Sequence, residues 1–412
     1  MEDAVIAAVD IGTTKVCTVI VEVKENELNV IGVGWQENTG AAKGAIINIA
    51  DTTDAIHKSV KKAEEMANVK VDAVLASISG KHIAGIKGHG ETALSHSRQK
   101  EITEEDMRRA MEGATSVPMS QDREKLHVIP TQYIVDSQDE IENPLGMTGM
   151  KLEVDAYVIT GSVTAVDNVR KVIERAGYRV ADIILQPLAS AEVVLYKDEK
   201  DVGVMLLDIG GGTTDIALYY KGALRFVKVV PVGGQHITND IVTGLQTPKA
   251  TAEDVKKKFG IIYSGDAQEA EAIEIPEMGS SRMMNVEGAK LTQIIKPRVH
   301  ELIKFVEAEL EKEGIERGMY AGGIILTGGT AMMKGLDRLI KEELDIRVRI
   351  GAPVKERVAG LYDIVNTPEY ATVIGLIEHY LKDVGRGTRL IGKKSAFASF
   401  VDYIKKLISD NI

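Results

Sequence analysis

The chain has 412 residues, 44% of them hydrophobic, so it is long enough to bury two or more hydrophobic cores. Its formal net charge of −11 disfavours non-specific binding to nucleic acid. Its single cysteine, Cys17, excludes a disulfide framework, and no apolar run reaches the roughly 18 residues that span a bilayer. The first residues are acidic and lack the pattern of a signal peptide, so we expect a cytosolic protein.

The first feature in chain order is a glycine turn between two apolar segments. The run Val5–Val9 leads into residues 10–15 (DIGTTK), and a second apolar run follows at Val16–Val23. This pattern predicts a strand, a tight turn and another strand. Backbone N–H groups and hydroxyls in such a turn suit a phosphate, and an acid at the end of a buried strand suits a hydrated Mg²⁺. Taken alone, the turn could equally be an ordinary hairpin.

The following elements are typical of half of an α/β domain. We expect a third strand at Leu28–Gly34, a helix at 53–67 with Asp51 or Thr52 as its N-cap, and a strand at Val71–Ser79. After residue 152 the pattern resumes as strand, helix, strand and helix at 156–160, 165–175, 180–186 and 188–196.

Between these stretches, residues 83–152 form a predicted insertion without a glycine-turn motif. It carries a capped helix at Thr103–Gly113 and an alternating strand at Val128–Val135. Its prolines, which we place between elements, are Pro118, Pro130 and Pro144.

A second glycine turn repeats the first in the other half of the chain. Residues 208–215 (DIGGGTTD) lie between apolar runs at 204–207 and 216–220. Two such turns predict related halves that face each other across a cleft, an arrangement suited to a nucleoside triphosphate and a metal. A third strand with a small-residue turn, 322–330 (GGIILTGGT), offers backbone against which a flat adenosine could lie.

The second half continues with a hairpin through 224–232 that leads to Gly233 and Gly234. A long amphipathic helix is expected at Leu291–Lys312, with Pro297 kinking or dividing it. The other elements that we expect are helices at 237–244, 251–259, 332–344 and 369–381 and strands at 273–275 and 347–350, the last helix closing the second domain.

The order and spacing of the three glycine segments resemble the actin, Hsp70 and sugar-kinase superfamily of ATP-binding proteins. The insertion and its N-P-x-G-M-x-G sequence at 143–149 resemble the bacterial FtsA cell-division family more narrowly. This resemblance implies an α/β, actin-like ATPase fold. Two ribonuclease-H-like domains would enclose a nucleotide cleft, with a small inserted subdomain and a C-terminal amphipathic helix.

The resemblance also implies a division of the chain. The expected parts are a first core subdomain (1–82 plus 153–196), the inserted subdomain (83–152), a second core subdomain (197–227 plus 303–384), an outer subdomain (228–302), a linker (385–394) and a membrane-targeting helix (395–412).

Single residues receive roles from the same resemblance. Asp10 and Asp208 would organise Mg²⁺ through water, and Gln186 occupies the position of the glutamine that orients the attacking water in actins. Arg298 and Glu301 of the outer subdomain would contact FtsZ. The residues expected to bind ATP are Gly12, Thr13, Thr14, Lys15, Gly210, Gly211, Gly212, Thr213, Thr214, Gly233, Gly234, Lys290, Gly328, Gly329 and Thr330.

The C-terminal segment predicts a membrane contact. Residues 386–412 contain six Lys or Arg and two Asp, a net charge of +4 on an otherwise acidic chain. A basic amphipathic helix on an acidic body suits an anionic inner leaflet, although most amphipathic helices pack on their own domain. The apolar arc and its flanking lysine are Phe397, Phe400, Val401, Ile404, Leu407, Ile408 and Lys405.

The resemblance to this family, taken with these features, implies an ATP-binding, actin-like cell-division protein at the cytoplasmic face of the septal membrane. It would form filaments, tether FtsZ polymers, recruit later division proteins through the insertion and hydrolyse ATP slowly if at all. An actin-like component of type IV pilus assembly and a small-molecule kinase of the same superfamily are the alternatives. An Hsp70-like chaperone would need a further substrate-binding domain, for which about 30 residues are too few.

Overall fold

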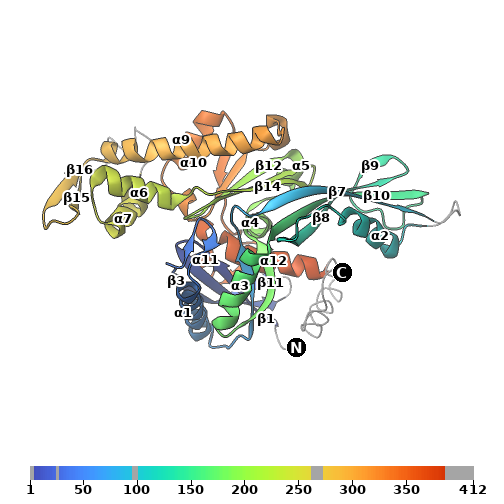
Figure 1. Ribbon diagram of the computed structural model, residues 1–412, viewed down its shortest axis with the longest axis horizontal. Helices are drawn as coiled ribbons and strands as arrows, with labels where there is room; N and C mark the ends of the chain where they lie inside the picture. Colours follow the sequence, from blue (N-terminus) through green and yellow to red (C-terminus); the bar gives the residue numbers. More distant parts are fainter. Residues whose placement is uncertain (1–3, 25–26, 95–100, 261–271, 386–412) are drawn as a thin grey trace.

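The computed structural model describes residues 4–24, 27–94, 101–260 and 272–385. Its body holds two core sheets with helices around them, and a third sheet that projects to one side (Figure 1). Within these described ranges, no helix combines the length and apolar character needed to cross a membrane. The predicted membrane helix and all of the linker beyond Gly385 lie outside the described residues.

The first core sheet has six strands in the order β11-β6-β1-β2-β3-β19. Its middle is an antiparallel meander of β1, β2 and β3, and β6 and β11 extend it in parallel. These strands are β1 (Ala4–Ile11), β2 (Lys15–Lys24), β3 (Glu27–Glu37), β6 (Ala73–Ile78), β11 (Arg179–Leu185) and β19 (Val358–Gly360). A small hairpin, β4 (Ala41–Ala42) with β5 (Ala45–Ile46), follows β3.

Two pairs of helices cover this sheet. α1 (Ile49–Ala67) and α3 (Val163–Arg175) contact each other, and α4 (Gln186–Val194) contacts α12 (Ala371–Gly385). The predicted N-cap of α1 is wrong. Asn48 caps the helix, because its side-chain oxygen accepts hydrogen bonds from the N–H groups of the next turn.

The second core sheet repeats the plan of the first. Its order is β14-β13-β12-β17-β18, with an antiparallel meander of β12, β13 and β14 extended in parallel by β17 and β18. The two related halves that the glycine turns predict are therefore present. The strands are β12 (Val204–Ile209), β13 (Thr214–Tyr220), β14 (Ala223–Val230), β17 (Ile324–Thr327) and β18 (Val348–Ile350).

The outer part of the second half is built around α9, which runs unbroken through Pro297. Apolar residues on both sides of the proline are buried in one core, and this packing keeps the helix together although the proline lacks an N–H. The neighbouring elements are α6 (Gly234–Leu245), α7 (Lys249–Phe259), β15 (Ile273–Pro276), β16 (Met283–Val286), α9 (Gly288–Lys312) and α10 (Leu336–Leu344). Shorter helical elements are α5 (Lys197–Val202), η1 (Arg317–Tyr320), η2 (Gly329–Met332), α11 (Tyr362–Val365) and η3 (Pro368–Tyr370).

The end of the described chain returns to the first half. β19 pairs in parallel with β3, and α12 packs on α4, β1 and β6. The prediction that this stretch closes the second core subdomain is therefore wrong. The buried face of α12, which includes Ile374 and Ile377 at 0% exposed, contacts β1, β2 and β6 of the first sheet.

The inserted subdomain is a four-stranded sheet with one helix. Its strands run in the order β7-β10-β8-β9. The predicted capped helix is present as α2, and its N-cap Thr103 forms a capping box with Asp106. Pro130 lies inside β8 and not between elements. It stands at an irregularity of the pairing with β10, where a proline is tolerated although it has no N–H to donate. The elements are β7 (Ala84–Ala93), α2 (Glu104–Ala114), β8 (Arg123–Val135), β9 (Gln138–Ile141) and β10 (Lys151–Ser162).

The close approach of α12 to α4 gives a stability prediction. A Cβ built on Gly375 would lie 1.9 Å from the carbonyl oxygen of Ala189, which is backbone and cannot move aside cheaply. Gly375→Ala should therefore lower the free energy of unfolding by about 1–3 kcal/mol in urea titrations. Gly318→Ala, at an exposed site with no heavy atom within 4 Å of the new Cβ, is the control and should change it by less than ~0.5 kcal/mol. Equal effects of both would contradict the packing argument.

Candidate nucleotide site

The two glycine turns have the same construction. In the first, the N–H of Gly12 donates to the carbonyl of Lys15 over 3.0 Å, and in the second the N–H of Gly210 donates to the carbonyl of Thr213 over 2.9 Å. Each turn joins the first two strands of its core sheet. The repeat that is visible in the sequence is thus a repeat of backbone geometry.

The turns face each other at contact distance. A Cβ built on Gly211 would lie 2.6 Å from the Thr14 methyl carbon, and one on Gly212 would lie 2.4 Å from the Thr13 hydroxyl. Only glycine leaves room for this approach. The sequence predicts two turns that close on one site from opposite halves, and the structure has this arrangement.

Three carboxylates lie beneath the turns. Asp10, next to the end of β1, accepts a hydrogen bond from Ser77 Oγ (2.7 Å). Asp208, on β12, accepts from Ser190 Oγ (2.6 Å) and from the Thr372 hydroxyl (3.1 Å).

The third carboxylate, Asp215, accepts from Thr213 Oγ1 (3.0 Å) and from the Ser79 hydroxyl. Sequence reasoning assigned no role to Asp215. The hairpin pattern could have pointed to Asp215, because Asp215 pairs directly with Asp208 across the second hairpin. In the first hairpin, the residue that pairs with Asp10 is Cys17.

Burial and mutual repulsion raise the pKa values of these three carboxyl groups. Burial raises the pKa of Asp208 to about 6, with the Asp10 charge adding to the effect. Burial raises the pKa of Asp215 to about 8, and the charges of Asp208 and Asp10 reinforce it. The pKa of Asp10 is raised by burial as well, against the opposing effects of Ser77 and Lys15. Buried carboxylates that are costly to ionise suit a hard divalent cation, which would neutralise their charge.

The third glycine segment adjoins this cluster. Gly328 lies so close to Asp208 that a Cβ there would be 2.4 Å from the carboxylate oxygen. Its φ of +83°, in the left-handed region, also favours glycine. Thr330 Oγ1 donates to the carbonyl of Gly210 over 3.0 Å, which ties the predicted adenosine segment to the second turn.

α6 begins against the second turn, and the N–H groups of Gly234 and Gln235 donate to the carbonyls of Gly210 and Gly211 over 2.9 and 2.7 Å. Next to this junction stands a buried lysine, Lys256, which the sequence did not single out.

Lys256 Nζ donates to the Gly234 carbonyl (3.1 Å) and pairs with Glu253 (2.7 Å), and burial lowers its pKa. The signal for these residues was only the i, i+3 spacing of an acid and a base on one predicted helix. By contrast, the predicted basic residue Lys290 is exposed. Lys290 precedes Arg298 by about two turns of α9, which corresponds to roughly 12 Å along the helix at 1.5 Å per residue.

Lys15 already has a partner in the structure. Its ammonium forms an ion pair with Glu369 (2.5 Å) and stands 5.3 Å from the centre of the Tyr370 ring. These residues belong to η3, whose Pro368 carbonyl accepts from the N–H of Gly328 (3.2 Å). The first turn and the adenosine segment are therefore linked through η3.

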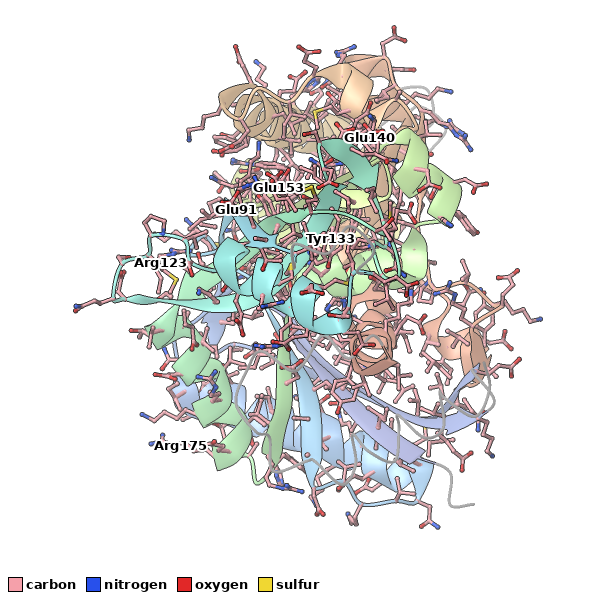
Figure 2. All side chains as sticks on the ribbon, turned by 90° about the vertical axis from the view of Figure 1, so that its right-hand side faces the viewer. Glu91, Arg123, Tyr133, Glu140, Glu153 and Arg175 are labelled. Carbon is pink, nitrogen blue, oxygen red and sulfur yellow. The ribbon has the colours of Figure 1, made fainter. Side chains whose placement is uncertain are left out.

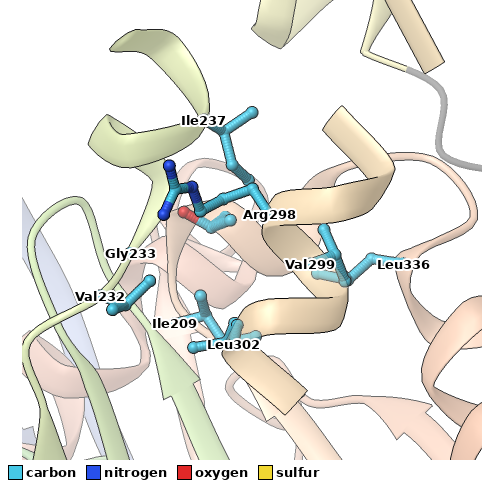
Figure 3. Close-up of a pocket in the computed structure, with 9 residues that line it drawn as sticks. Ile209, Val232, Gly233, Ile237, Arg298, Val299, Leu302 and Leu336 are labelled. Atoms are coloured by element: carbon cyan, nitrogen blue, oxygen red, sulfur yellow. The ribbon is translucent and has the colours of Figure 1, made fainter. Parts of the chain in front are cut away.

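Arg298 lines two pockets, one on each side of its side chain. It lines a small apolar pocket together with Gly233 and Thr330 (Figure 3). Its guanidinium donates to both oxygens of Asp240 (2.7 and 2.8 Å) and also pairs with Glu301. On the other side, Arg298 and Glu301 line a groove of about 500 Å³ between α6 and α9.

Comparison with known proteins identifies the family. A profile described as "Cell division protein FtsA" matches residues 205–375, and one described as "SHS2 domain inserted in FTSA" matches 80–160. The cell division protein FtsA of Pseudomonas aeruginosa is 37% identical over 395 residues, covering 96% of this chain and 93% of the relative. The chain belongs to the FtsA family. FtsA of Bacillus subtilis (38% identity; 95% and 86% covered) and of Escherichia coli K12 (34%; 98% and 96% covered) agree.

Similar solved structures show that this chain has the actin-like fold. The PilM–PilN type IV pilus biogenesis complex aligns with a TM-score of 0.63 at 18% identity, covering 90% of this chain and 97% of the other. MreB5 of Spiroplasma citri bound to ADP aligns with a TM-score of 0.57 at 16% identity, covering 95% and 100%. The predicted fold class is confirmed. At these identities the pilus protein shows a shared fold alone, and the curated relatives favour neither a pilus component nor a small-molecule kinase.

The raised pKa values give a pH prediction for the nucleotide-free protein. Asp215 has a folded pKa of about 8 against about 3.9 in an unfolded chain, so the folded state binds more protons between these values. Its stabilising contribution is fully present below pH 4 and is lost as the pH rises through 8. Thermal unfolding without Mg²⁺ or nucleotide should therefore show stability that falls from pH 5 to pH 8. Asp215→Asn should flatten that slope, by at most ~1.4 kcal/mol per pH unit, and an unchanged slope would contradict the assignment.

Proposed function

We propose that this FtsA-family protein binds ATP with Mg²⁺ between its core sheets, assembles into filaments and tethers FtsZ polymers to the cytoplasmic membrane. The observation that carries the nucleotide proposal is the contact of two glycine turns above three buried carboxylates. Turns of this kind present N–H groups to phosphates, and the carboxylates supply the counter-charge for a hydrated cation.

The site residues then have distinct tasks. Asp10, Asp208 and Asp215 would hold Mg²⁺ through water, and the cation would neutralise charge on the phosphates. The two turns would cradle the phosphates, with Lys15 exchanging Glu369 for a phosphate oxygen. Gly328–Thr330 would adjoin adenosine, and Lys256 of α7, which contacts Gly234 at the start of α6, would lie near the same side. Gln186 would orient water for slow hydrolysis.

Removing one negative charge tests the metal assignment. Asp208→Asn keeps a side chain of the same shape, and it removes a group that is costly to ionise, so the variant should fold. We expect its affinity for ATP to fall about tenfold or more with Mg²⁺ and to change little in excess chelator. Fluorescent-nucleotide titrations measure both values. Asp54→Asn, an exposed acid on α1, is the control, and equal losses with and without Mg²⁺ would contradict the role.

Membrane attachment is proposed for residues 395–412. Full burial of one large apolar side chain stabilises by about 1.5–3 kcal/mol, and insertion at an interface gives less. A single short helix should therefore bind reversibly. Many copies along a filament would bind far more firmly through their effective concentration. Attachment would then depend on assembly, and ATP would favour it to the extent that it binds the assembling conformation more tightly.

FtsZ is proposed to dock at the groove between α6 and α9. The groove combines apolar walls from Ile294 and Pro297 with the charged groups of Arg298, Asp240 and Glu301. Such a lining suits a short helix or strand with an apolar face and charges of both signs. This use of Arg298 is compatible with its ion pairs, because the side chain is 28% exposed.

Later division proteins are proposed to bind the inserted subdomain. Glu91, Glu153 and Glu140 come from three of its strands, and Figure 2 shows them with that subdomain toward the viewer. Glu91 and Glu140 are exposed and pair with Lys151 and Lys221, so a basic segment that displaces these lysines is the partner chemistry that we propose for this surface.

Co-sedimentation with anionic vesicles and FtsZ separates the two attachments. Deletion of 395–412 should abolish vesicle binding and leave FtsZ binding intact, while Arg298→Ala should weaken FtsZ binding and leave vesicle binding intact. Lys304→Ala, an exposed cation on the same helix, controls for loss of charge. The tether proposal would be wrong if the truncated protein carried FtsZ to vesicles as well as the full chain does.

A further inference from the structure

Ser77 occupies a central position between two residues of the nucleotide site. It lies on β6, next to its end, and is 1% exposed. Its hydroxyl donates to Asp10 Oδ1 over 2.7 Å and accepts from the N–H of Ile11 over 2.9 Å. It also accepts from Gln186 Nε2 over 3.1 Å. One buried hydroxyl therefore contacts the end of β1 and the side chain that begins α4.

The hydrogen bonds of Gln186 determine which atom of its side-chain amide can bind a water molecule. The amide nitrogen donates to Asp10 Oδ1 (3.1 Å) and to Ser77 (3.1 Å), which uses both of its hydrogens. Among the residues that the structure describes, none donates to the amide oxygen. Because the side chain is only partly buried, this oxygen is open to a water molecule. An amide whose nitrogen is doubly engaged can act toward water only as an acceptor.

The main chain at Gln186 is held from another direction. The N–H of Leu185, the last residue of β11, donates to His127 Nε2 over 3.0 Å. His127 lies on β8 of the inserted subdomain, and burial lowers its pKa to about 3, so the ring stays neutral and able to accept. With backbone and nitrogen both fixed, the amide oxygen has little freedom left.

We propose that Ser77 is a positioning residue for ATP hydrolysis, which it serves by fixing the Gln186 amide with its oxygen toward the attacking water. The inference rests on the proposed nucleotide site. In the reaction, the water oxygen bonds to the γ-phosphorus while the bond to the β–γ bridging oxygen breaks. The electron pair of that bond leaves with ADP, and the proton of the water goes to the phosphate product. Gln186 accepts a hydrogen bond from the water and takes no proton.

The test combines three variants with a buried control. Ser77→Ala removes the hydroxyl, Ser77→Thr retains it, and Ser77→Ala in a Gln186→Ala background asks whether the effect passes through the glutamine. Ser59→Ala is the control, because Ser59 is another fully buried serine of the same core with two hydrogen bonds, to Gly34 and Thr18. Each protein is assayed for kcat, for affinity toward Mg²⁺–ATP and for thermal stability.

A spectroscopic readout covers the protein without nucleotide. The side-chain NH₂ resonances of Gln186, assigned through Gln186→Ala, report hydrogen bonding at the amide nitrogen. We expect Ser77→Ala to shift them, Ser77→Thr to preserve them, and Ser59→Ala to leave them unchanged.

A positioning role predicts a particular pattern of kinetics. Ser77→Ala should lower kcat by about 10–100-fold and change the affinity for Mg²⁺–ATP by less than about threefold. It should have no further effect on kcat in the Gln186→Ala background, and Ser77→Thr should restore most of the rate.

Other outcomes would overturn the inference. These are a loss of ATP affinity equal to the loss of kcat, additive effects in the double variant, unshifted Gln186 resonances, or no measurable turnover by the parent protein. In the last case ATP binding would still stand, so failure of the positioning role is distinguishable from failure of the nucleotide site.

Discussion

The contact between the two glycine turns is the constraint on which the site depends. Gly211 and Gly212 approach Thr14 and Thr13 so closely that any side chain in their place would collide. This approach brings the ends of β1 and β12 together and buries their acids in one cluster. Burial in this cluster raises the pKa values of Asp208 and Asp215, and the charges of the neighbouring carboxylates add to the effect. The fold thus accepts an unfavourable electrostatic arrangement, which a bound cation would relieve.

The two halves repeat in backbone but differ in chemistry at one informative position. The residue opposite Asp10 is Cys17, a buried apolar thiol whose pKa burial raises to about 12, whereas the residue opposite Asp208 is Asp215. The second half therefore supplies two of the three carboxylates. The first half supplies the groups around Asp10, namely Ser77, Lys15 and Gln186. The two halves are thus similar in fold, but they contribute different residues to the site.

The local sequence pattern predicted those structural features that depend on residues close together in the sequence. Both turns, the capping box at Thr103 and most strands follow from apolar runs, glycines and caps within about ten residues. The return of β19 and α12 to the first sheet could not be predicted from local pattern, because the pairing of β19 with β3 joins residues more than 300 positions apart. Lys256 was missed for the same reason. Its spacing to Glu253 looks like an ordinary surface pair, and only the packing of α7 against the start of α6 buries it beside Gly234.

The inserted subdomain couples the two halves mechanically although the chain enters it from the first half alone. Its β8 holds the end of β11 through His127, and the Tyr157 hydroxyl on β10 accepts from the N–H of Val227 on β14, 3.2 Å away. β14 is an edge strand of the second core sheet, so this bond pairs an N–H that would otherwise need water. Rotation of the second sheet against the first must therefore break this contact or carry the insertion with it.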